Sequence, residues 1–279
     1  MKTLGEDTSE MLEYVPSHFK VIRHIRPKLA CTRCDKIIQA SAPSRPIARG
    51  LAGPRLLAHV LVSKYADHLP LYRQSQIYAR SGIELDRSTL AHWVGGAHEL
   101  LAPLVDALAQ HVLAGSHVHA DDTPYPVLAP GTGKTKNARI WTYLWTVPAL
   151  QGSSSSVRQV VVQLSIRPYG VGATGLDEIR GSAPNYVWRA RSSRGPTGLA
   201  DPGPTGCHHS VDCPRRLNRG GERAAGIYSL IGTAKLNSID PEAYLRYVLE
   251  RVAEHPINQI EELLPWNVLA KLPSLGLAA

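Results

Sequence analysis

Residues 151–220 have no sustained hydrophobic pattern, whereas the chain on both sides of them does. This interruption limits the folds that the chain can adopt. Of these 70 residues, 25 are Gly, Ser or Pro, and nine are Arg whereas none is Lys. After a strand-like run over 157–166 no hydrophobic period persists. Such a composition buries too little apolar surface to offset the chain entropy that folding removes. We therefore expect poor order here, with the fold built from residues 1–150 and 220–279.

Residues 1–50 predict a small β-rich module. Polar and apolar residues roughly alternate over 13–16 and 19–25, which is typical of strands with one buried face. Pro and Gly are frequent from 41 to 54, and this composition indicates a linker to the next segment.

Cys31 and Cys34 form a Cys-x-x-Cys pair, which supplies half of a tetrahedral zinc site. A complete structural site needs a second Cys or His pair, held in place by a fold. The alternative is two reduced thiols without metal, and four cysteines in 279 residues do not suggest a disulfide scaffold. Other metal-capable residues have no spacing that fixes a site: His18, His24, Cys207, His208, His209 and Cys213.

Residues 51–115 predict helices. Apolar residues follow a 3.6-residue period over 56–65 and again over 71–78, and Asp86 or Ser88 can cap a third helix. A short Gly-containing turn separates the second and third helices, which is compatible with a DNA-reading helix-turn-helix. The alternative is a plain helical hairpin within a larger core. In the DNA-reading interpretation the contacting residues are Arg87, Ser88, Thr89 and His92.

Two adjacent acids, Asp121 and Asp122, end an alternating strand-like run that starts at His117. We expect the regular strand to stop there, because Pro124 and Pro126 interrupt pairing. A carboxylate at a strand end is a natural ligand for Mg²⁺. Successive strand residues point to opposite faces, so only one of the two acids can lead a site. We favour Asp121, and the alternative is a pair of exposed acids without metal.

The run ending at Leu128 and the aromatic-rich run 139–147 predict a β-hairpin. Its loop contains Gly133, Lys134 and Lys136 and imitates the end of a phosphate-binding P-loop. That motif needs Gly where Leu128 stands, and no long helical pattern follows the loop. We therefore interpret Lys134 and Lys136 as a basic hairpin tip that could contact a DNA phosphate backbone.

The segment 220–279 returns to a helical period, and Asp240-Pro241-Glu242 is a helix start with a cap and an early acid. Lys and Arg (31) exceed Asp and Glu (23) by 8, and the pI near 9.4 suits a polyanionic partner, nucleic acid first. No stretch is long and apolar enough to span a membrane, and no apolar signal core follows Met1. We therefore expect a cytoplasmic protein without a membrane partner.

Several long strings of the sequence are similar to one family of bacterial proteins. They cover 6–10, 14–16, 19–23, 31–34, 61–74, 220–225, 228–231, 233–235 and 240–245, together with Ala120-Asp121-Asp122-Thr123-Pro124, which resembles an Ala-Asp-Glu-Thr-Pro motif. These strings resemble the insertion-sequence family 66 bacterial transposases over about 1–147 and 219–266. Strings of this length are far more specific than a short motif.

The resemblance implies a DNA transposase with a ribonuclease-H-like catalytic domain, in which an Asp-Asp-Glu triad holds two Mg²⁺ ions. By motif, Asp121 would be the first triad member and a Mg²⁺ ligand. Cys31 and Cys34 would belong to a zinc finger and bind Zn²⁺ as a half site. The implied partners are the DNA of the element ends and of the target, and homo-oligomerisation is left open.

The sequence departs from the family where the triad should be completed. The second Asp and the Glu of an Asn-Asn-x-x-Glu-Arg string belong between Trp145 and Gly220, and nothing there matches either. Glu222 belongs to a later string and is not the triad Glu. Our hypothesis is that residues 148–218 are read in a shifted frame with an internal deletion, which leaves the transposase catalytically incomplete. The alternative is a residual DNA-binding module without catalysis.

The predicted fold class is therefore α+β, with five segments along the chain. They are a partial zinc-finger-like β module (1–50), a helical segment with a helix-turn-helix (51–115), the start of an incomplete ribonuclease-H-like α/β domain (116–150), a low-order segment (151–219) and C-terminal helices (220–279).

Overall fold

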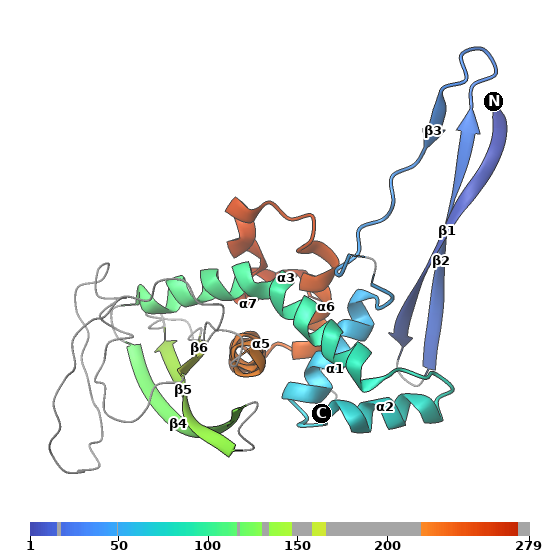
Figure 1. The fold of residues 1–279 in the computed structure, drawn as a ribbon. Helices are drawn as coiled ribbons and strands as arrows, with labels where there is room; N and C mark the ends of the chain where they lie inside the picture. The colour runs from blue at the N-terminus through green and yellow to red at the C-terminus, as the bar shows by residue number, and fades with distance from the viewer. Residues whose placement is uncertain are drawn as a thin grey trace, which may run out of the picture.

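The computed structural model describes residues 1–15, 18–48, 50–115, 118–129, 134–146, 158–165 and 219–272. In these ranges the chain has a long N-terminal β-ribbon, a group of helices and a second antiparallel sheet (Figure 1). The α+β class expected from the sequence is confirmed. None of the described helices is long and apolar enough to cross a membrane.

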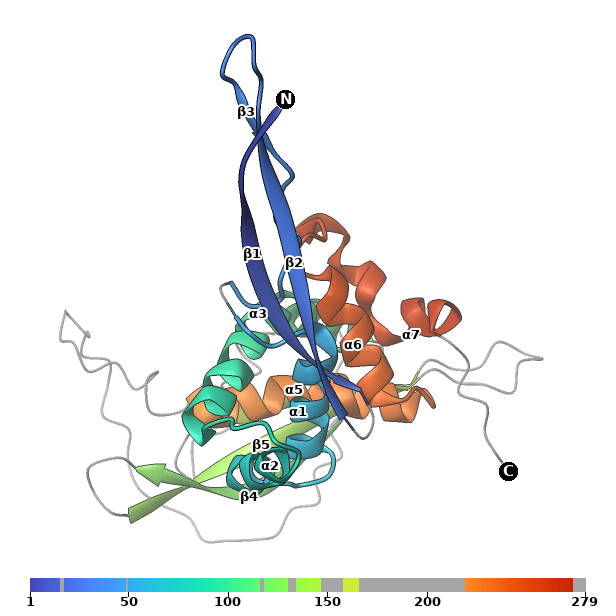
Figure 2. The same ribbon diagram turned by 90° about the vertical axis from the view of Figure 1, so that its right-hand side faces the viewer.

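The N-terminal β-ribbon projects away from the helices (Figures 1 and 2). Its two long strands pair antiparallel from Val15 opposite His18 at the base to Lys2 opposite Ala30 at the tip. Gly5 lies at the one register shift and has φ of 144°, a conformation that side chains rarely adopt. The strands expected over 13–16 and 19–25 are only the inner part of this ribbon. Its strands are β1 (Lys2–Val15), β2 (His18–Ala30) and β3 (Ile37–Gln39).

The base of the ribbon is attached to the start of helix α1 (Pro54–Tyr65). The Leu12 amide donates to the Leu51 carbonyl (2.7 Å), and the Gly53 amide donates to the Leu12 carbonyl (2.8 Å). Gly53, the N-cap residue, has no side chain to cap the helix, and the buried Glu13 carboxylate accepts hydrogen bonds from the Arg55 and Leu56 amides instead. A Cβ at position 53 would overlap this carboxylate.

Three helices follow the linker, as the 3.6-residue pattern predicts. The third continues past Pro103 and fills the rest of the helical segment expected over 51–115. It continues because Leu101, Leu104 and Leu108 extend the same buried stripe. The three helices are α1, α2 (Leu71–Arg80) and α3 (Arg87–Leu113).

The C-terminal segment completes the core that these helices begin. α6 packs against α1, and α5 packs against α3 (Figure 2). The expected cap is confirmed, since Asp240 Oδ2 accepts a 2.8 Å hydrogen bond from the Ala243 amide. Tyr244 is fully buried and donates its hydroxyl to the Leu263 carbonyl at 2.9 Å. The elements are α5 (Arg219–Leu236), α6 (Pro241–Arg251), α7 (Pro265–Val268) and the short 3₁₀ helices η2 (Ile257–Leu263) and η3 (Leu269–Lys271).

The second sheet is an antiparallel meander with strand order β4-β5-β6, which confirms the expected hairpin and the strand-like run after it. The expected strand end at Asp122 is wrong, because β4 continues through Pro124 and Pro126. β4 is an edge strand, and two prolines two residues apart can both leave their missing N–H on the open side. The strands are β4 (Val118–Ala129), β5 (Lys134–Thr146) and β6 (Arg158–Ser165).

Candidate functional site

A groove of about 850 Å³ lies where the end of α1 and the starts of α2 and α3 meet. We call it the three-helix groove. Its lining combines two cationic side chains, a hydroxyl, an aromatic ring and one acid. The lining residues are Lys64, Pro70, Leu71, Tyr72, Asp86, Arg87, Ser88 and Ala91.

The turn between α2 and α3 holds the groove in shape. Gly82, with φ of 81°, follows α2 in the left-handed region where glycine is favoured, and its amide donates to the Ala79 carbonyl at 3.0 Å. Ser75 Oγ donates to the Leu85 carbonyl at 2.5 Å, and Leu85 itself is buried. The direction of α3 relative to α2 is therefore fixed by contacts within one short stretch of chain.

The four residues predicted to read DNA lie in the first two turns of α3. Arg87 and Ser88 are exposed and line the three-helix groove. His92 is exposed one turn further along, and Thr89 is partly buried. The structure thus brings Arg87, Ser88 and His92 to the solvent-facing start of the helix. Contact of these residues with DNA stays a prediction.

Two residues of the groove were missed by sequence reasoning. Lys64 lies on the helical stripe of α1; its ammonium is 5.0 Å from the Tyr65 ring centroid, and burial lowers its pKa. Tyr72 is 47% exposed and accepts a 3.1 Å hydrogen bond from Arg73 Nε through its hydroxyl oxygen. A cation on an otherwise apolar stripe was the available signal for Lys64. Nothing in the sequence distinguishes Tyr72 from a core residue.

The composition of the groove suits an anionic, planar ligand. Two cations can neutralise phosphate oxygens, the Ser88 hydroxyl can donate a hydrogen bond, and an exposed tyrosine ring offers a stacking surface. Asp86 is the one acid in the lining, and it stands at the N-cap position of α3 without a side-chain capping bond.

Asp121 lies in β4, opposite Thr142 of β5, and is exposed. Its neighbour Ala120 is opposite the buried Tyr143, so Asp121 points to the other face of the sheet. The side chain of Asp122 lies outside the described residues. No group of three or more His, Cys, Asp or Glu side chains that could hold a metal occurs in the described ranges. Magnesium at Asp121 therefore stays a prediction, with one described carboxylate to support it.

Cys31 and Cys34 stand in the turn between β2 and β3, at the tip of the ribbon. The turn is closed by hydrogen bonds from the Cys31 amide to the Lys36 carbonyl and from the Asp35 amide to the Cys31 carbonyl, both 3.0 Å. The Arg33 and Cys34 amides donate to the Cys31 sulfur, and these bonds lower the pKa of its thiol. Neither cysteine forms a disulfide, and Cys34 is exposed. This arrangement favours thiolate and presents two sulfurs to a metal.

The two metal-capable histidines of β2 do not join this pair. His24 precedes Cys31 by seven residues along β2, which is about 23 Å at about 3.3 Å per residue, and His18 is further away. These histidines, for which no spacing predicted a site, therefore do not complete the Cys31–Cys34 site within a single chain. Cys207, His208, His209 and Cys213 lie outside the described residues.

Lys134 and Lys136 belong to β5 by their backbone, opposite Ala129 and Val127 of β4. Their side chains and the loop 130–133 lie outside the described part of the chain. The hairpin that was expected to carry them is present, and a phosphate contact by these lysines stays a prediction.

Three family models match the chain, in the order of its parts. The model for the zinc-finger binding domain of transposase IS66 matches residues 1–35, which include the ribbon and Cys31 and Cys34. The transposase IS66 family model matches 49–158, from the linker to the start of β6. The model for the IS66 C-terminal element matches 229–266.

Relatives with similar sequences occur in Sinorhizobium fredii (strain NBRC 101917 / NGR234), and each carries the description "uncharacterized protein". Protein y4qI is 49% identical over 140 residues, which are 50% of this chain and 26% of the relative. Protein y4hP is 29% identical over 396 aligned positions, which include 96% of this chain and 71% of the relative. Protein y4jD is 41% identical over 174 residues, 58% of this chain and 34% of the relative.

The chain thus spans about a quarter of y4qI and about a third of y4jD. No solved structure matches it. The three family models cover the ribbon, the helices with the second sheet, and the C-terminal helices, and on that combined match the chain belongs to the IS66 family of transposases.

Proposed function

We propose that this chain is a DNA-binding protein of transposase descent, which keeps a surface for holding DNA but has lost the carboxylate set for Mg²⁺-dependent strand cleavage and transfer. The observation that carries the proposal is an asymmetry between two sites. The three-helix groove is complete within the described residues, whereas Asp121 is the one residue that matches the family's triad by motif.

The groove supports DNA binding through both charge and shape. Arg87 and Lys64 can neutralise backbone phosphates, and the chain's formal charge of +8 favours a polyanion over its whole surface. Ser88 and His92 lie on the same exposed start of α3 and can approach base edges or sugar oxygens once the phosphates fix the helix. This use of the helix start agrees with a helix-turn-helix, in which the second helix enters the major groove.

The proposed loss of cleavage rests on the number of carboxylates. Two-metal phosphoryl transfer needs two or three acids that converge on the ions. The family relation implies two further acids beyond Asp121, and the sequence between Trp145 and Gly220 contains neither motif. The residues present therefore do not fit a two-magnesium site, and we derive no catalytic step through one.

The comparison with y4hP supports an internal deletion. Its alignment spans 396 positions, whereas this chain has 279 residues, so at least 117 aligned positions have no residue here. The loss of that many positions is large enough to include both missing acids together with the strands or helices that carried them.

The proposal is tested by the affinity of the purified chain for duplex DNA, including the DNA that flanks its own gene, across a salt series. We expect the affinity for DNA to fall steeply as the salt concentration rises. Arg87→Ala should weaken binding about tenfold and reduce the slope of log affinity against log salt by about one, because one phosphate contact is lost. Arg251→Ala is the matched control, because Arg251 is an exposed cation on α6 that does not line the groove. Binding that does not depend on salt would contradict the proposal, and so would an equal loss of DNA affinity in both variants.

A further inference from the structure

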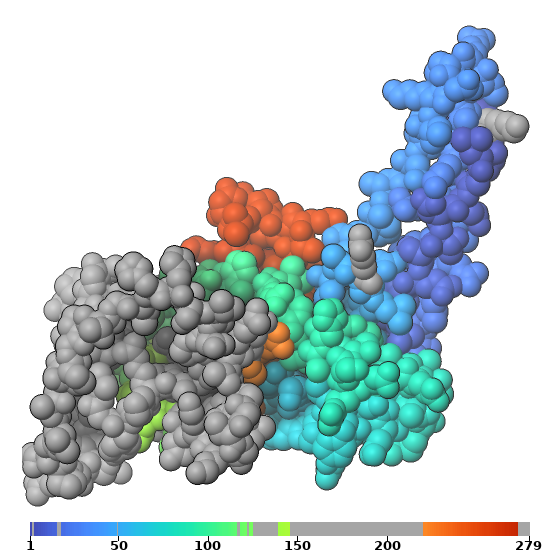
Figure 3. All heavy atoms as spheres, in the orientation of Figure 1, coloured from blue at the N-terminus to red at the C-terminus, as the bar shows by residue number. Residues whose placement is uncertain are grey.

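The β-ribbon stands clear of the helices over its outer part (Figure 3). Large apolar side chains are exposed along its strands, from the base to the tip. A two-stranded ribbon is marginally stable alone in water, because it buries few side chains. Apolar surface on a projecting element marks an interaction site. Between 48% and 74% of each of these side chains is exposed: Met1, Leu4, Val21, Ile25, Ile37 and Ile38.

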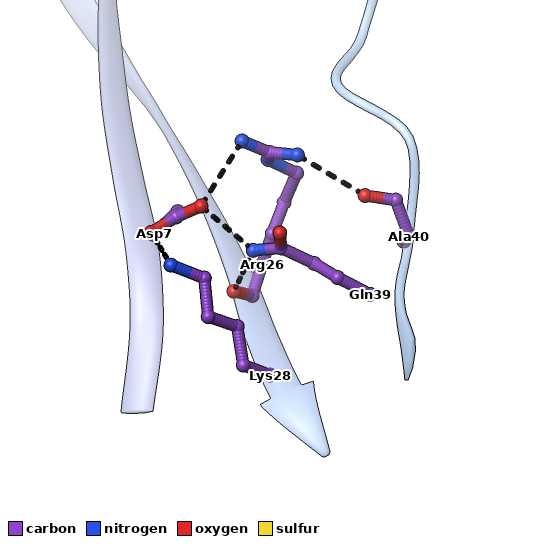
Figure 4. A network of polar contacts seen from close by, with 5 residues as sticks. All are labelled: Asp7, Arg26, Lys28, Gln39 and Ala40. Carbon is purple, nitrogen blue, oxygen red and sulfur yellow. Dashed lines mark hydrogen bonds and ion pairs between the residues drawn. The ribbon is translucent and has the colours of Figure 1, made fainter. Parts of the chain in front are cut away.

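On one face of the ribbon, charged and polar side chains pair with partners in the same chain, as Figure 4 shows. Asp7 Oδ1 lies 2.6 Å from Lys28 Nζ, and Asp7 Oδ2 accepts a 2.9 Å hydrogen bond from Gln39 Nε2. Arg26 lies 3.6 Å from Asp7 Oδ2 and also donates to the Ala40 carbonyl at 3.1 Å. This polar network ties β1, β2 and the chain after β3 together.

The opposite face has a different chemistry. Val21 and Ile25 share it, because residues four apart on a strand point the same way, and Ile38 joins them through its pairing with β2. The Glu10–Arg23 ion pair (2.6 Å) lies between Val21 and Ile25. Apolar side chains flanking one paired charge form a surface that can pack on another protein.

The same ribbon ends in half a metal site. Cys31 and Cys34 stand in the turn between β2 and β3, which backbone hydrogen bonds already close. The described residues offer no cluster that could add further ligands, and His24 is about 23 Å away along β2. A zinc-finger model matches this region, yet the described residues supply two of the four ligands that a structural zinc site requires.

We propose that two copies of this chain share one zinc ion between their ribbon tips, with Cys31 and Cys34 of each copy as the four ligands. A two-fold pair uses the same surface on both copies, so one half site per chain becomes one complete Cys₄ site. The faces that carry Ile38, Ile25 and Val21 pack together along the ribbons, from the metal at the tips toward the bases. Each thiol that enters the site loses its proton to solvent as its zinc–sulfur bond forms.

This site is independent of DNA binding at the three-helix groove, and metal and mass measurements test it. The full chain is reduced, stripped of metal and titrated with Zn²⁺, and in parallel with Co²⁺. We expect one metal per two chains, a doubling of the solution mass that chelation reverses, and a cobalt spectrum with thiolate charge-transfer bands and tetrahedral ligand-field bands.

Variants separate this site from other cysteines of the chain. Cys31→Ser/Cys34→Ser should abolish both metal binding and the mass doubling without unfolding the chain, because Cys34 is exposed and Cys31 only partly buried. The matched control is Cys207→Ser/Cys213→Ser, which should change neither. Ile38→Ser should weaken zinc-dependent association about tenfold, whereas Ile257→Ser, on a 73% exposed residue of η2, should not.

Three results would overturn the proposal. One metal per chain at unchanged mass would place the site within a single copy. Mass doubling that persists after chelation, or in Cys31→Ser/Cys34→Ser, would show a dimer that does not need the metal. Absence of metal binding by the reduced chain would remove the site.

Discussion

The three-helix groove and the Asp121 strand differ in how far along the chain their residues are spread. The groove draws all its lining residues from positions 64 to 91, so one short stretch of sequence builds it. A triad built on Asp121 needs acids from segments far along the chain, because the family motifs for them follow Trp145. A change within one distant segment therefore removes the triad and leaves the groove intact. On the proposed account, a binding surface encoded within one short stretch of sequence persists where a catalytic site assembled from distant parts is lost.

The largest expected effect tests whether the groove also depends on the distant C-terminal segment. Leu245 of α6 is fully buried in the shared core. Leu245→Ala should lower the free energy of unfolding by about 2–5 kcal/mol, because it leaves a cavity. Denaturant unfolding of the full chain measures this. A change below about 1 kcal/mol would show that the C-terminal helices do not complete the core around α1 and α3.

Gly53→Ala should give the next largest effect, at the joint between ribbon and helices. A Cβ there overlaps the Glu13 carboxylate, which has to leave the start of α1. We expect a loss of about 1–3 kcal/mol, as for other overpacked sites. Gly82→Ala is not an equivalent control because of its positive φ, so Gly220→Ala, with open space around its Cβ, is used instead. Equal stability of Gly53→Ala and Gly220→Ala would contradict the Glu13 capping arrangement.

A smaller effect depends on pH. Burial raises the pKa of Glu13 above its usual 4.5, and its Oε1 is buried without a hydrogen-bond partner. Because the pKa of Glu13 is higher in the folded state than in the unfolded state, this group adds to the stability of the fold below about pH 4.5. That contribution is lost as the pH rises through the folded-state pKa. Glu13→Gln does not titrate there. The stability of the parent relative to Glu13→Gln should therefore fall as pH rises from 4.5, and a flat difference across the series would contradict the buried state of this carboxyl.

Periodic patterns predicted most of the helices and the second sheet correctly. The stripe over 56–65, the cap at Asp240 and the hairpin around Gly133 each depend on residues close in sequence. The outer ribbon was underpredicted because residues 2–10 of β1 have no one-sided apolar pattern. The regular pairing of β4 was expected to break at Pro124 and Pro126, and it continues because proline is tolerated on an edge strand. Strand order, which makes β4 an edge strand, is not visible in a sequence.

The candidate site was only partly predictable for a related reason. Arg87 and Ser88 were found because a helix start has its own signals. Lys64 and Tyr72 reach the same groove from other helices, and their approach depends on the turn between α1 and α2. In that turn His68 has φ of 54°, and the Leu69 amide donates to the Ser63 carbonyl at 2.8 Å. Such tertiary geometry leaves no period in the sequence.

The most direct test of the central claim measures DNA binding and DNA cleavage on the same purified chain. Labelled duplex that carries the DNA flanking its gene is incubated with Mg²⁺, with the parent chain and with Asp121→Asn. The account predicts salt-dependent binding by both proteins, with affinities within about twofold of each other, and no Mg²⁺-dependent strand cleavage by either. Cleavage that requires Mg²⁺ and disappears in Asp121→Asn would contradict it, because a working carboxylate set would then be present.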